Sequence, residues 1–124
     1  MKRILVVDDD PSMRSLLQRA LRLAGYSVEA LGSGEECLRR LEADLPDLLI
    51  LDLMMPRLDG VGVLECMDRQ GIRLKTLILS AKDEEESCPE DLKRAAAYLA
   101  KPMPMTALMD TVRGLLGEVR PARG

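Results

Sequence analysis

Phenylalanine, tryptophan and histidine are absent from this chain of 124 residues, and Tyr26 and Tyr98 are its only aromatic residues. Proteins that bind nucleic acids by base stacking use aromatic side chains, so this scarcity argues against that mode of binding. A formal net charge of -3 also argues against a broad surface for DNA phosphates. We therefore expect no direct nucleic-acid binding and a core built from aliphatic side chains.

Cysteine is rare, and the three cysteines, Cys37, Cys66 and Cys88, do not form an even set. Their spacing matches no zinc site, and we expect reduced thiols in the cytoplasm. No apolar stretch approaches the roughly 20 residues of a membrane span. Residues 4–7 are apolar but stop at three aspartates, unlike a signal peptide. These absences predict a cytoplasmic protein that does not associate with membranes.

What the chain does contain is a regular alternation of short apolar runs and amphipathic helical patterns. Hydrophobic residues make up 47% and charged residues 31%, which fits one globular domain with one core. Strands are expected at residues 4–7, 27–31, 48–51, 76–79 and 97–100. Helices are expected after Asp10, after Ser33, after Asp59 and from Met105, with a short or frayed helix between Lys82 and Lys93.

This alternation predicts a doubly wound α/β fold, because parallel strands need crossover helices on both faces of the sheet. We expect five parallel strands in the flavodoxin-like order 2-1-3-4-5, with five helices on the two faces. In that order the first and third strands are neighbours, and ligands bind at their carboxyl ends. Residues 1–118 should form this domain, and residues 119–124 a disordered tail or the start of a linker.

Carboxylates follow the first and third expected strands. Asp8 and Asp9 come directly after residues 4–7, and Asp52 follows the apolar run 48–51. Two unit charges about 4 Å apart repel by roughly 4 kcal/mol at an effective dielectric near 20, so the cluster needs a cation. Oxygen ligands favour Mg²⁺, with Mn²⁺ or Ca²⁺ as substitutes. The alternative is that the first aspartates only cap a helix and that Asp52 is a solvated turn residue.

Two further polar groups are expected at the same edge of the sheet. Ser80 ends the fourth strand and Lys101 follows the fifth. Each alone is weak, since a strand-end serine is usually a helix cap and a loop lysine is usually solvated. Together with a metal ion they would surround a phosphoryl group on Asp52 and stabilise its charge.

The same residues occur in four short segments with a specific joint spacing. These segments are Ile4–Pro11 (ILVVDDDP), Leu51–Gly60 (LDLMMPRLDG), Leu79–Ala81 (LSA) and Tyr98–Pro102 (YLAKP). In this respect the chain resembles the receiver domain of bacterial two-component response regulators over roughly residues 2–118. The resemblance implies that Asp52 accepts a phosphoryl group from a phosphohistidine on a sensor histidine kinase or phosphotransfer protein.

The resemblance also implies the roles of the neighbouring residues. Asp9 would bind Mg²⁺ directly, Asp8 would act largely through water, and the backbone carbonyl of Met54 would complete the protein ligands. Lys101 would pair with the phosphoryl oxygens, and the Lys101-Pro102 peptide bond would be cis.

The resemblance further implies a switch formed by Ser80 and Tyr98. Ser80 would move to hydrogen-bond a phosphoryl oxygen, and Tyr98 would follow it inward and transmit the change to the output surface. From the sequence alone, Tyr98 could equally be a half-buried residue of the fifth strand. Met54 and Lys82, two residues beyond Asp52 and Ser80, would tune the lifetime of the phosphoryl group.

The region before the fifth strand departs from the family pattern. Arg94-Ala95 stands where the family usually has Gly-Ala, and the interval from Ser80 to Lys101 is about one residue short. With Pro89 and an acidic run, this predicts a mobile segment from about Asp83 to Leu92.

Three functions compete at this stage. The first is a phosphorylation-controlled signalling switch, which assists its own phosphotransfer and dephosphorylation and acts as a monomer or a phosphorylation-dependent dimer. It would need an output partner or a missing effector domain. The second is a Mg²⁺ phosphohydrolase of the haloacid-dehalogenase type, but Met54 stands where its general acid would be. The third is a receiver-like interaction module that is not phosphorylated.

Overall fold

Five parallel strands form a single sheet with the order β2-β1-β3-β4-β5, as the sequence predicted. The structure is a computed structural model that describes residues 1–80 and 95–117. The strands are β1 (Arg3–Val7), β2 (Ser27–Leu31), β3 (Leu48–Asp52), β4 (Thr76–Ser80) and β5 (Ala97–Ala100). Asp52 is the last residue of β3, one residue beyond the apolar run 48–51, and Ser80 is the last residue of β4, as expected. In the ladder Asp52 pairs with Leu79 and Ser80 with Ala100.

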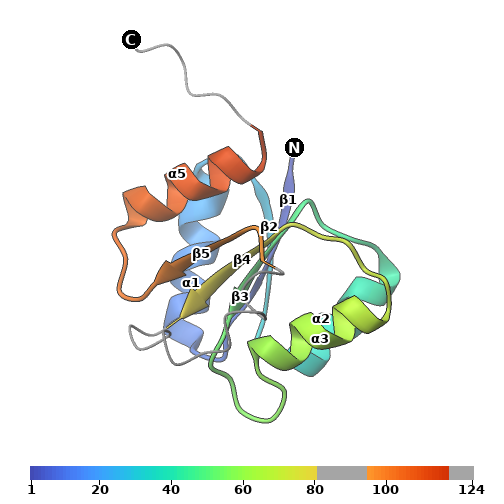
Figure 1. The fold of residues 1–124 in the computed structure, drawn as a ribbon. Coiled ribbons are helices and arrows are strands. Elements are labelled where there is room, and N and C mark those ends of the chain that lie inside the picture. The colour runs from blue at the N-terminus through green and yellow to red at the C-terminus, as the bar shows by residue number, and fades with distance from the viewer. Residues whose placement is uncertain (81–94, 118–124) are drawn as a thin grey trace.

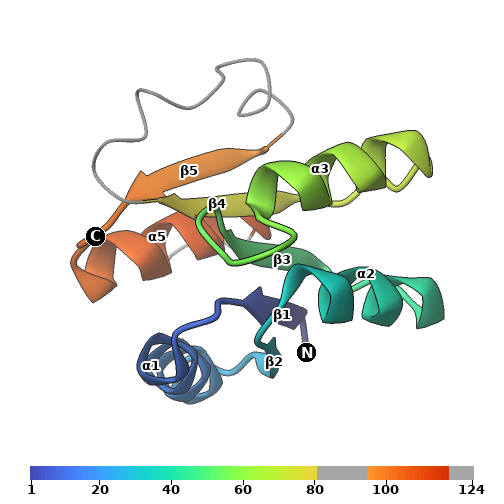
Figure 2. The ribbon, with the colours of Figure 1, turned by 90° about the horizontal axis from the view of Figure 1, so that it is seen from below.

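Helices cover both faces of the sheet, as a doubly wound fold requires (Figures 1 and 2). They are α1 (Pro11–Leu23), α2 (Gly34–Ala43), α3 (Gly60–Arg69) and α5 (Met105–Leu115). Figure 2 shows α1 and α5 on one side of the sheet and α2 and α3 on the other. The short helix expected between Lys82 and Lys93, the mobile segment predicted from Asp83 to Leu92, and the tail 119–124 lie outside the described residues.

Helix starts follow from the capping residues in the sequence. Asp10 accepts a hydrogen bond from the backbone N–H of Ser12 (3.0 Å), and Pro11 takes the first helical position of α1. Ser33 accepts from the N–H of Glu36 (3.1 Å) at the start of α2. The Glu36 carboxylate reaches back to the N–H of Gly32 (3.2 Å), one residue before the cap. These contacts set where each helix leaves the carboxyl edge of the sheet.

The core consists of two aliphatic layers, one on each face of the sheet. Alternate residues of β1 divide between them: Ile4 and Val6 pack towards α1 and α5, and Leu5 and Val7 towards α2 and α3. All residues of β3 and β4 are buried, as expected for central strands covered on both faces. Within the described residues, Tyr26 is the aromatic side chain in this core. The buried middle of the sheet therefore holds its carboxyl edge rigidly in place.

The Lys101-Pro102 peptide bond, directly after β5, is cis, as the resemblance implied.

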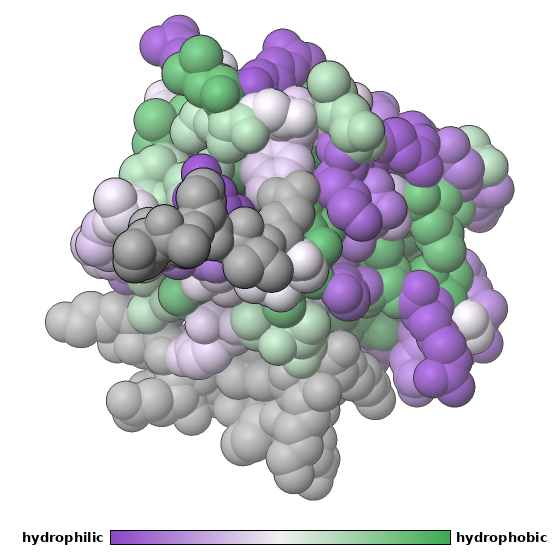
Figure 3. Space-filling view, turned by 90° about the horizontal axis from the view of Figure 1, so that it is seen from above, coloured by the Kyte–Doolittle hydropathy of each residue, from purple (hydrophilic) through white to green (hydrophobic). Residues whose placement is uncertain are grey.

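In the described part of the chain, no helix has both the length and the apolar character needed to cross a membrane. The face seen from above in Figure 3 mixes hydrophilic residues with smaller hydrophobic areas.

Candidate functional site

Three carboxylates meet at the carboxyl edge of the sheet. Asp8 and Asp9 follow β1, and Asp52 ends β3, its neighbour in the sheet. One carboxylate oxygen from each of the three lies within 4.8 Å of the other two. Asp8 and Asp52 are buried and Asp9 is exposed, so the cluster opens to solvent on the side of Asp9. The sheet topology thus brings together the acids that the sequence places 43 or more residues apart.

Asp8 is buried, with only 1% of its surface exposed, and each of its polar groups has a hydrogen-bond partner. Its backbone N–H donates to the carbonyl of Leu31 in β2 (3.1 Å). Its carbonyl accepts from Nη1 of Arg14 in α1 (2.8 Å). Its carboxylate accepts from the N–H of Asp10 (2.9 Å) and from Nζ of Lys101 (3.1 Å). Four different segments of the chain therefore hold this one residue, which explains how a buried carboxylate is tolerated.

The ammonium group of Lys101 lies between two carboxylates. Its Nζ is 3.1 Å from Oδ2 of Asp8 and 3.5 Å from Oδ1 of Asp52. Burial lowers the pKa of Lys101, but the hydrogen bond to Asp8 and the charges of Asp52 and Asp8 outweigh it, so the pKa is raised overall. Lys101 is therefore a charged ammonium group at neutral pH.

The ionised form of Asp52 remains unfavourable in spite of the nearby Lys101 ammonium. Burial and the charge of Asp8 raise its pKa to about 6, against the lowering effects of Lys101 and of the Met54 backbone N–H. That N–H donates to Oδ1 of Asp52 over 3.3 Å. One ammonium is too little positive charge for the buried pair of acids, and a further cation would stabilise the ionised form.

The donor set fits a hard divalent cation. The chain has no histidine, and within the described residues the cluster consists of carboxylates, whose oxygens are the ligands preferred by Mg²⁺. Burial and the charge of Asp8 raise the pKa of Asp52, and a cation bound between these carboxylates would offset both effects. The Met54 carbonyl, expected as a further ligand, stays a prediction. What the structure records for Met54 is its N–H on Asp52 and a side chain that is 66% exposed.

Ser80 and Tyr98 lie on the neighbouring strands. Ser80 is 2% exposed and ends β4, beside the end of β3, so its hydroxyl belongs to the same edge as Asp52. Tyr98 pairs with Ile78 in the ladder and is 36% exposed. The ring is thus not buried in this state of the protein, and the switch roles of the two residues stay predictions.

The loop after Asp52 depends on a glycine whose role the sequence pattern did not reveal. A Cβ on Gly60 would lie 2.7 Å from Cα of Leu53 and 2.8 Å from the carbonyl oxygen of Asp52. The Gly60 N–H donates to the Leu53 carbonyl (2.9 Å). We expected Gly60 only as the start of a helix; it also lets α3 approach the backbone of the site. A close approach of this kind leaves no periodic signal in the sequence.

Arg14 was also missed. It lies on α1, where the sequence shows only an amphipathic pattern, and six residues separate it from Asp8, whose carbonyl it binds. No motif marked it, because the contact depends on how the chain turns between β1 and α1.

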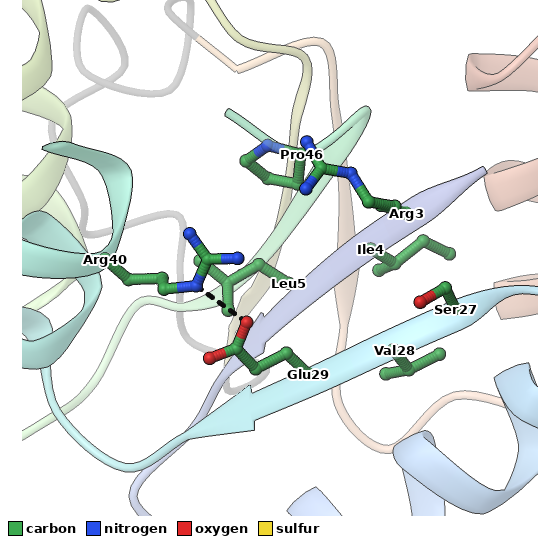
Figure 4. A pocket seen from close by; sticks show the side chains of 8 residues that line it. All are labelled: Arg3, Ile4, Leu5, Ser27, Val28, Glu29, Arg40 and Pro46. Atoms are coloured by element: carbon green, nitrogen blue, oxygen red, sulfur yellow. Dashed lines mark hydrogen bonds and ion pairs between the residues drawn. The ribbon is translucent and has the colours of Figure 1, made fainter. Parts of the chain in front are cut away.

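A separate cavity of about 270 Å³ lies at the other end of β1 and β2 (Figure 4). The charged side chains that line it are all in ion pairs: Arg40 with Glu29 (2.7 Å), and both Arg40 (2.6 Å) and Arg3 (2.8 Å) with Asp44, which lies outside the lining. Because each of these charges has an oppositely charged partner, the ion pairs beside this cavity leave no excess charge there, unlike the acid cluster.

Comparison with known proteins places this arrangement in context. Residues 4–113 match the family model described as the response regulator receiver domain. Response regulator MprA of Mycobacterium avium (strain 104) is 42% identical over 120 residues, covering 96% of this chain and 53% of that protein. MprA of Mycobacterium leprae (strain TN) matches with the same identity and shares. The chain therefore spans about half the length of these relatives.

Solved structures show the same fold. The Francisella response regulator 1452 receiver domain superposes with a TM-score of 0.87 at 30% identity, over 94% of this chain and 98% of that one. Response regulator TrrA from Thermotoga maritima, solved in complex with Mg²⁺-BeF, gives a TM-score of 0.84 at 34% identity. That alignment covers 93% of this chain and 99% of TrrA.

Proposed function

Because the chain belongs to the response regulator receiver domain family, we propose that it is a phosphorylation-dependent switch in which Asp52 accepts the phosphoryl group. One observation carries the assignment: the Asp52 carboxylate lies between the buried Asp8 and the exposed Asp9 of the acid cluster and the ammonium of Lys101. Anionic ligands for a cation and an ammonium for phosphoryl oxygens are the two requirements for phosphoryl transfer to a carboxylate.

Asp52 is the nucleophile in this proposal. An oxygen of its carboxylate attacks the phosphorus of a phosphohistidine, an O–P bond forms, and the P–N bond breaks with its electron pair going to the imidazole nitrogen. The N–H of Met54 holds the Asp52 carboxylate in place. A Mg²⁺ ion held by Asp8, Asp9, Asp52 and the Met54 carbonyl would neutralise charge on the phosphoryl oxygens.

Lys101 and Ser80 respond to the new charge. On phosphorylation the ammonium of Lys101, now 3.5 Å from Asp52, exchanges part of its contact with Asp8 for a phosphoryl oxygen. The Ser80 hydroxyl donates a hydrogen bond to another such oxygen, and Tyr98 turns inward from its exposed position on β5. These movements would link the phosphoryl group to the surface of β5 and α5.

The partners follow from this role. The donor is a sensor histidine kinase or a phosphotransfer protein, and the output passes to a partner protein or to an effector domain. The relatives named above are about twice as long as the matched region. We place the switch in the cytoplasm, and we expect Mn²⁺ or Ca²⁺ to replace Mg²⁺ in the site. Slow self-dephosphorylation by water would reset it.

Acetyl phosphate and beryllofluoride test the proposal directly. With Mg²⁺, acetyl phosphate should transfer one phosphoryl group per chain and release acetate, seen by intact mass, and beryllofluoride should bind at the same carboxylate without transferring a group. Asp52→Asn should abolish both. Asp59→Asn is the matched control, because Asp59 is the exposed cap of α3 and accepts from the Gly62 N–H (2.9 Å). Turnover of many equivalents would instead identify a phosphohydrolase, and no modification at all would identify an interaction module that is not phosphorylated.

A further inference from the structure

Arg14 is a charged residue beside the acid cluster that the proposed chemistry does not use. Its Nη1 donates to the carbonyl oxygen of Asp8 over 2.8 Å, in partly buried surroundings. That carbonyl belongs to the peptide group whose N–H is that of Asp9. A charge-assisted hydrogen bond to it therefore fixes the peptide plane from which the Asp9 side chain departs.

The backbone of Gly32 also lies close to this guanidinium. A Cβ on Gly32, in the turn between β2 and α2, would lie 2.9 Å from Nη1 of Arg14 and 3.4 Å from its Cζ. Gly32 has no left-handed backbone angle that would require glycine. The space it leaves is thus occupied by the Arg14 side chain, which is held between this turn and the Asp8 carbonyl.

The remaining contacts of Asp8 show why this matters for a metal ion. The Asp8 N–H is bound to Leu31 and its carboxylate to Asp10 and Lys101. Between the described residues, the hydrogen bond to the Asp8 carbonyl comes from Arg14. Without it the peptide joining the two aspartates would be free to rotate, and the exposed Asp9 carboxylate, which has an oxygen within 4.8 Å of one of Asp52, would move away from the cluster.

We infer that Arg14 is a positioning residue for the cation site: its bond to the Asp8 carbonyl, kept in place by the space at Gly32, aims the Asp9 carboxylate at the metal. This inference rests on the proposed function, because it concerns the Mg²⁺ that the acid cluster would hold. Residues that orient metal ligands without touching the metal typically change affinity by about 10- to 100-fold when they are replaced.

Charge and position make opposite predictions here, which allows a sharp test. A guanidinium near a cation site repels the cation, so removing it should tighten Mg²⁺ binding if charge alone counts. If Arg14 acts by position, removing it should weaken binding. The measurement is the Mg²⁺ dissociation constant by calorimetry, without a phosphoryl donor, for the wild type, Arg14→Gln, Gly32→Ala and the double variant. Arg19→Gln is the control, because Arg19 is an exposed arginine of the same helix.

The expected result is about tenfold weaker Mg²⁺ binding by Arg14→Gln. Gly32→Ala should weaken it in the same direction, since the methyl group displaces the guanidinium without removing its charge. In the Arg14→Gln background Gly32→Ala should add nothing, because the side chain it displaces is gone. Arg19→Gln should bind like the wild type. With acetyl phosphate, the Mg²⁺ concentration for half-maximal rate should rise while the rate at saturating Mg²⁺ stays unchanged.

Other outcomes separate the two levels of the argument. Equal or tighter Mg²⁺ binding by both Arg14→Gln and Gly32→Ala, with a wild type that binds normally, would overturn the positioning role alone. A wild type that does not bind Mg²⁺ would overturn the proposed function and this inference with it. Thermal unfolding by circular dichroism without Mg²⁺ checks the fold of each variant. If Arg14→Gln does not fold, the result for Gly32→Ala decides.

Discussion

Lys101 and Asp8 form a partly buried ion pair at 3.1 Å, and this pair leaves Asp52 with too little positive charge nearby. The ammonium is closer to Asp8 than to Asp52, which lies 3.5 Å away. Asp8 is in addition fixed by hydrogen bonds to its other polar groups, whereas the Asp52 carboxylate accepts a longer bond of 3.3 Å from the Met54 N–H. In the metal-free protein the ionised form of Asp52, the residue that we propose is phosphorylated, is therefore the unfavourable charge of the site.

The first prediction follows from that cost. Burial and the charge of Asp8 raise the pKa of Asp52 from 3.8 to about 6, so the metal-free folded protein holds the Asp52 proton more tightly than the unfolded chain does. The contribution of Asp52 to stability is most favourable below pH ~4 and falls as the pH rises to about 6, because the unfolded chain loses this proton first. Above that range the penalty is constant, on the order of 1–3 kcal/mol. Mg²⁺ should remove most of it.

Asp52→Asn tests this pH dependence. The amide is neutral and nearly isosteric, so at pH 7.5 without Mg²⁺ the variant should be more stable than the wild type by about 1–3 kcal/mol in urea unfolding. Its stability should also lack the decline that Asp52 causes between pH 4 and 6. Asp59→Asn at the exposed cap is the control. A variant that is less stable than the wild type at pH 7.5 would contradict the electrostatic account.

The second prediction concerns the cation of the ion pair. Lys101→Met removes the charge that lowers the pKa of Asp52, so that pKa should rise above about 6. Two buried carboxylates would then face each other without an ammonium, and the metal-free fold should lose about 1–3 kcal/mol at neutral pH, less than for a fully buried pair because Lys101 is 23% exposed.

Carboxyl NMR titration of Asp52 and urea unfolding provide the two measurements for Lys101→Met. The exposed Lys2 serves as the control through Lys2→Met, which should change neither quantity. An unchanged Asp52 titration in Lys101→Met would show that the ammonium does not act on this carboxylate.

The third prediction compares one substitution at two helical glycines. Gly60→Ala would place a methyl group 2.7 Å from the Leu53 backbone and should cost about 1–3 kcal/mol, because backbone atoms cannot give way cheaply. Gly114→Ala in α5 meets no atom within 4 Å and should stabilise the protein by about 0.5–1 kcal/mol. Urea unfolding measures both. Equal effects at the two positions would mean that Gly60 is not needed for close approach.

These residues also show what sequence reasoning could and could not reach. The five strands follow from periodicity, and the order 2-1-3-4-5 follows from the flavodoxin-like fold class. Given that order, Asp8, Asp9 and Asp52 converge because neighbouring parallel strands share a carboxyl edge. Each depends on residue type and spacing along the chain. The expected helix between Lys82 and Lys93 lies outside the described residues, so four of the five predicted helices are confirmed.

What the sequence could not show depends on contacts between distant backbone segments. The bond from Arg14 to the Asp8 carbonyl and the approach of Gly60 to Leu53 arise only when turns are placed to within a fraction of an ångström. Neither residue type is unusual at its position, since arginines are common on helix surfaces and glycine is common at helix starts. The acids and the lysine were therefore predictable, and the backbone contacts of Arg14 and Gly60 were not.

The last prediction concerns the loop between Asp52 and α3. Arg57 has a φ of 64°, in the left-handed region that a non-glycine residue adopts at a cost of about 1–2 kcal/mol. Its ion pair with Glu35 is long, at 3.7 Å, and the Arg57 side chain is 77% exposed, so that contact contributes little. Relief of backbone strain should therefore outweigh the lost ion pair, and Arg57→Gly should stabilise the protein by roughly 0.5–1 kcal/mol.

Arg57→Ala is the matched control for this loop, because it removes the ion pair and keeps the left-handed backbone. It should leave the free energy of urea unfolding almost unchanged. If Arg57→Ala destabilises the protein as much as Arg57→Gly stabilises it, the contact with Glu35 is stronger than its geometry indicates. If both variants have wild-type stability, the loop relaxes to another backbone conformation and stores no strain beside the proposed phosphorylation site.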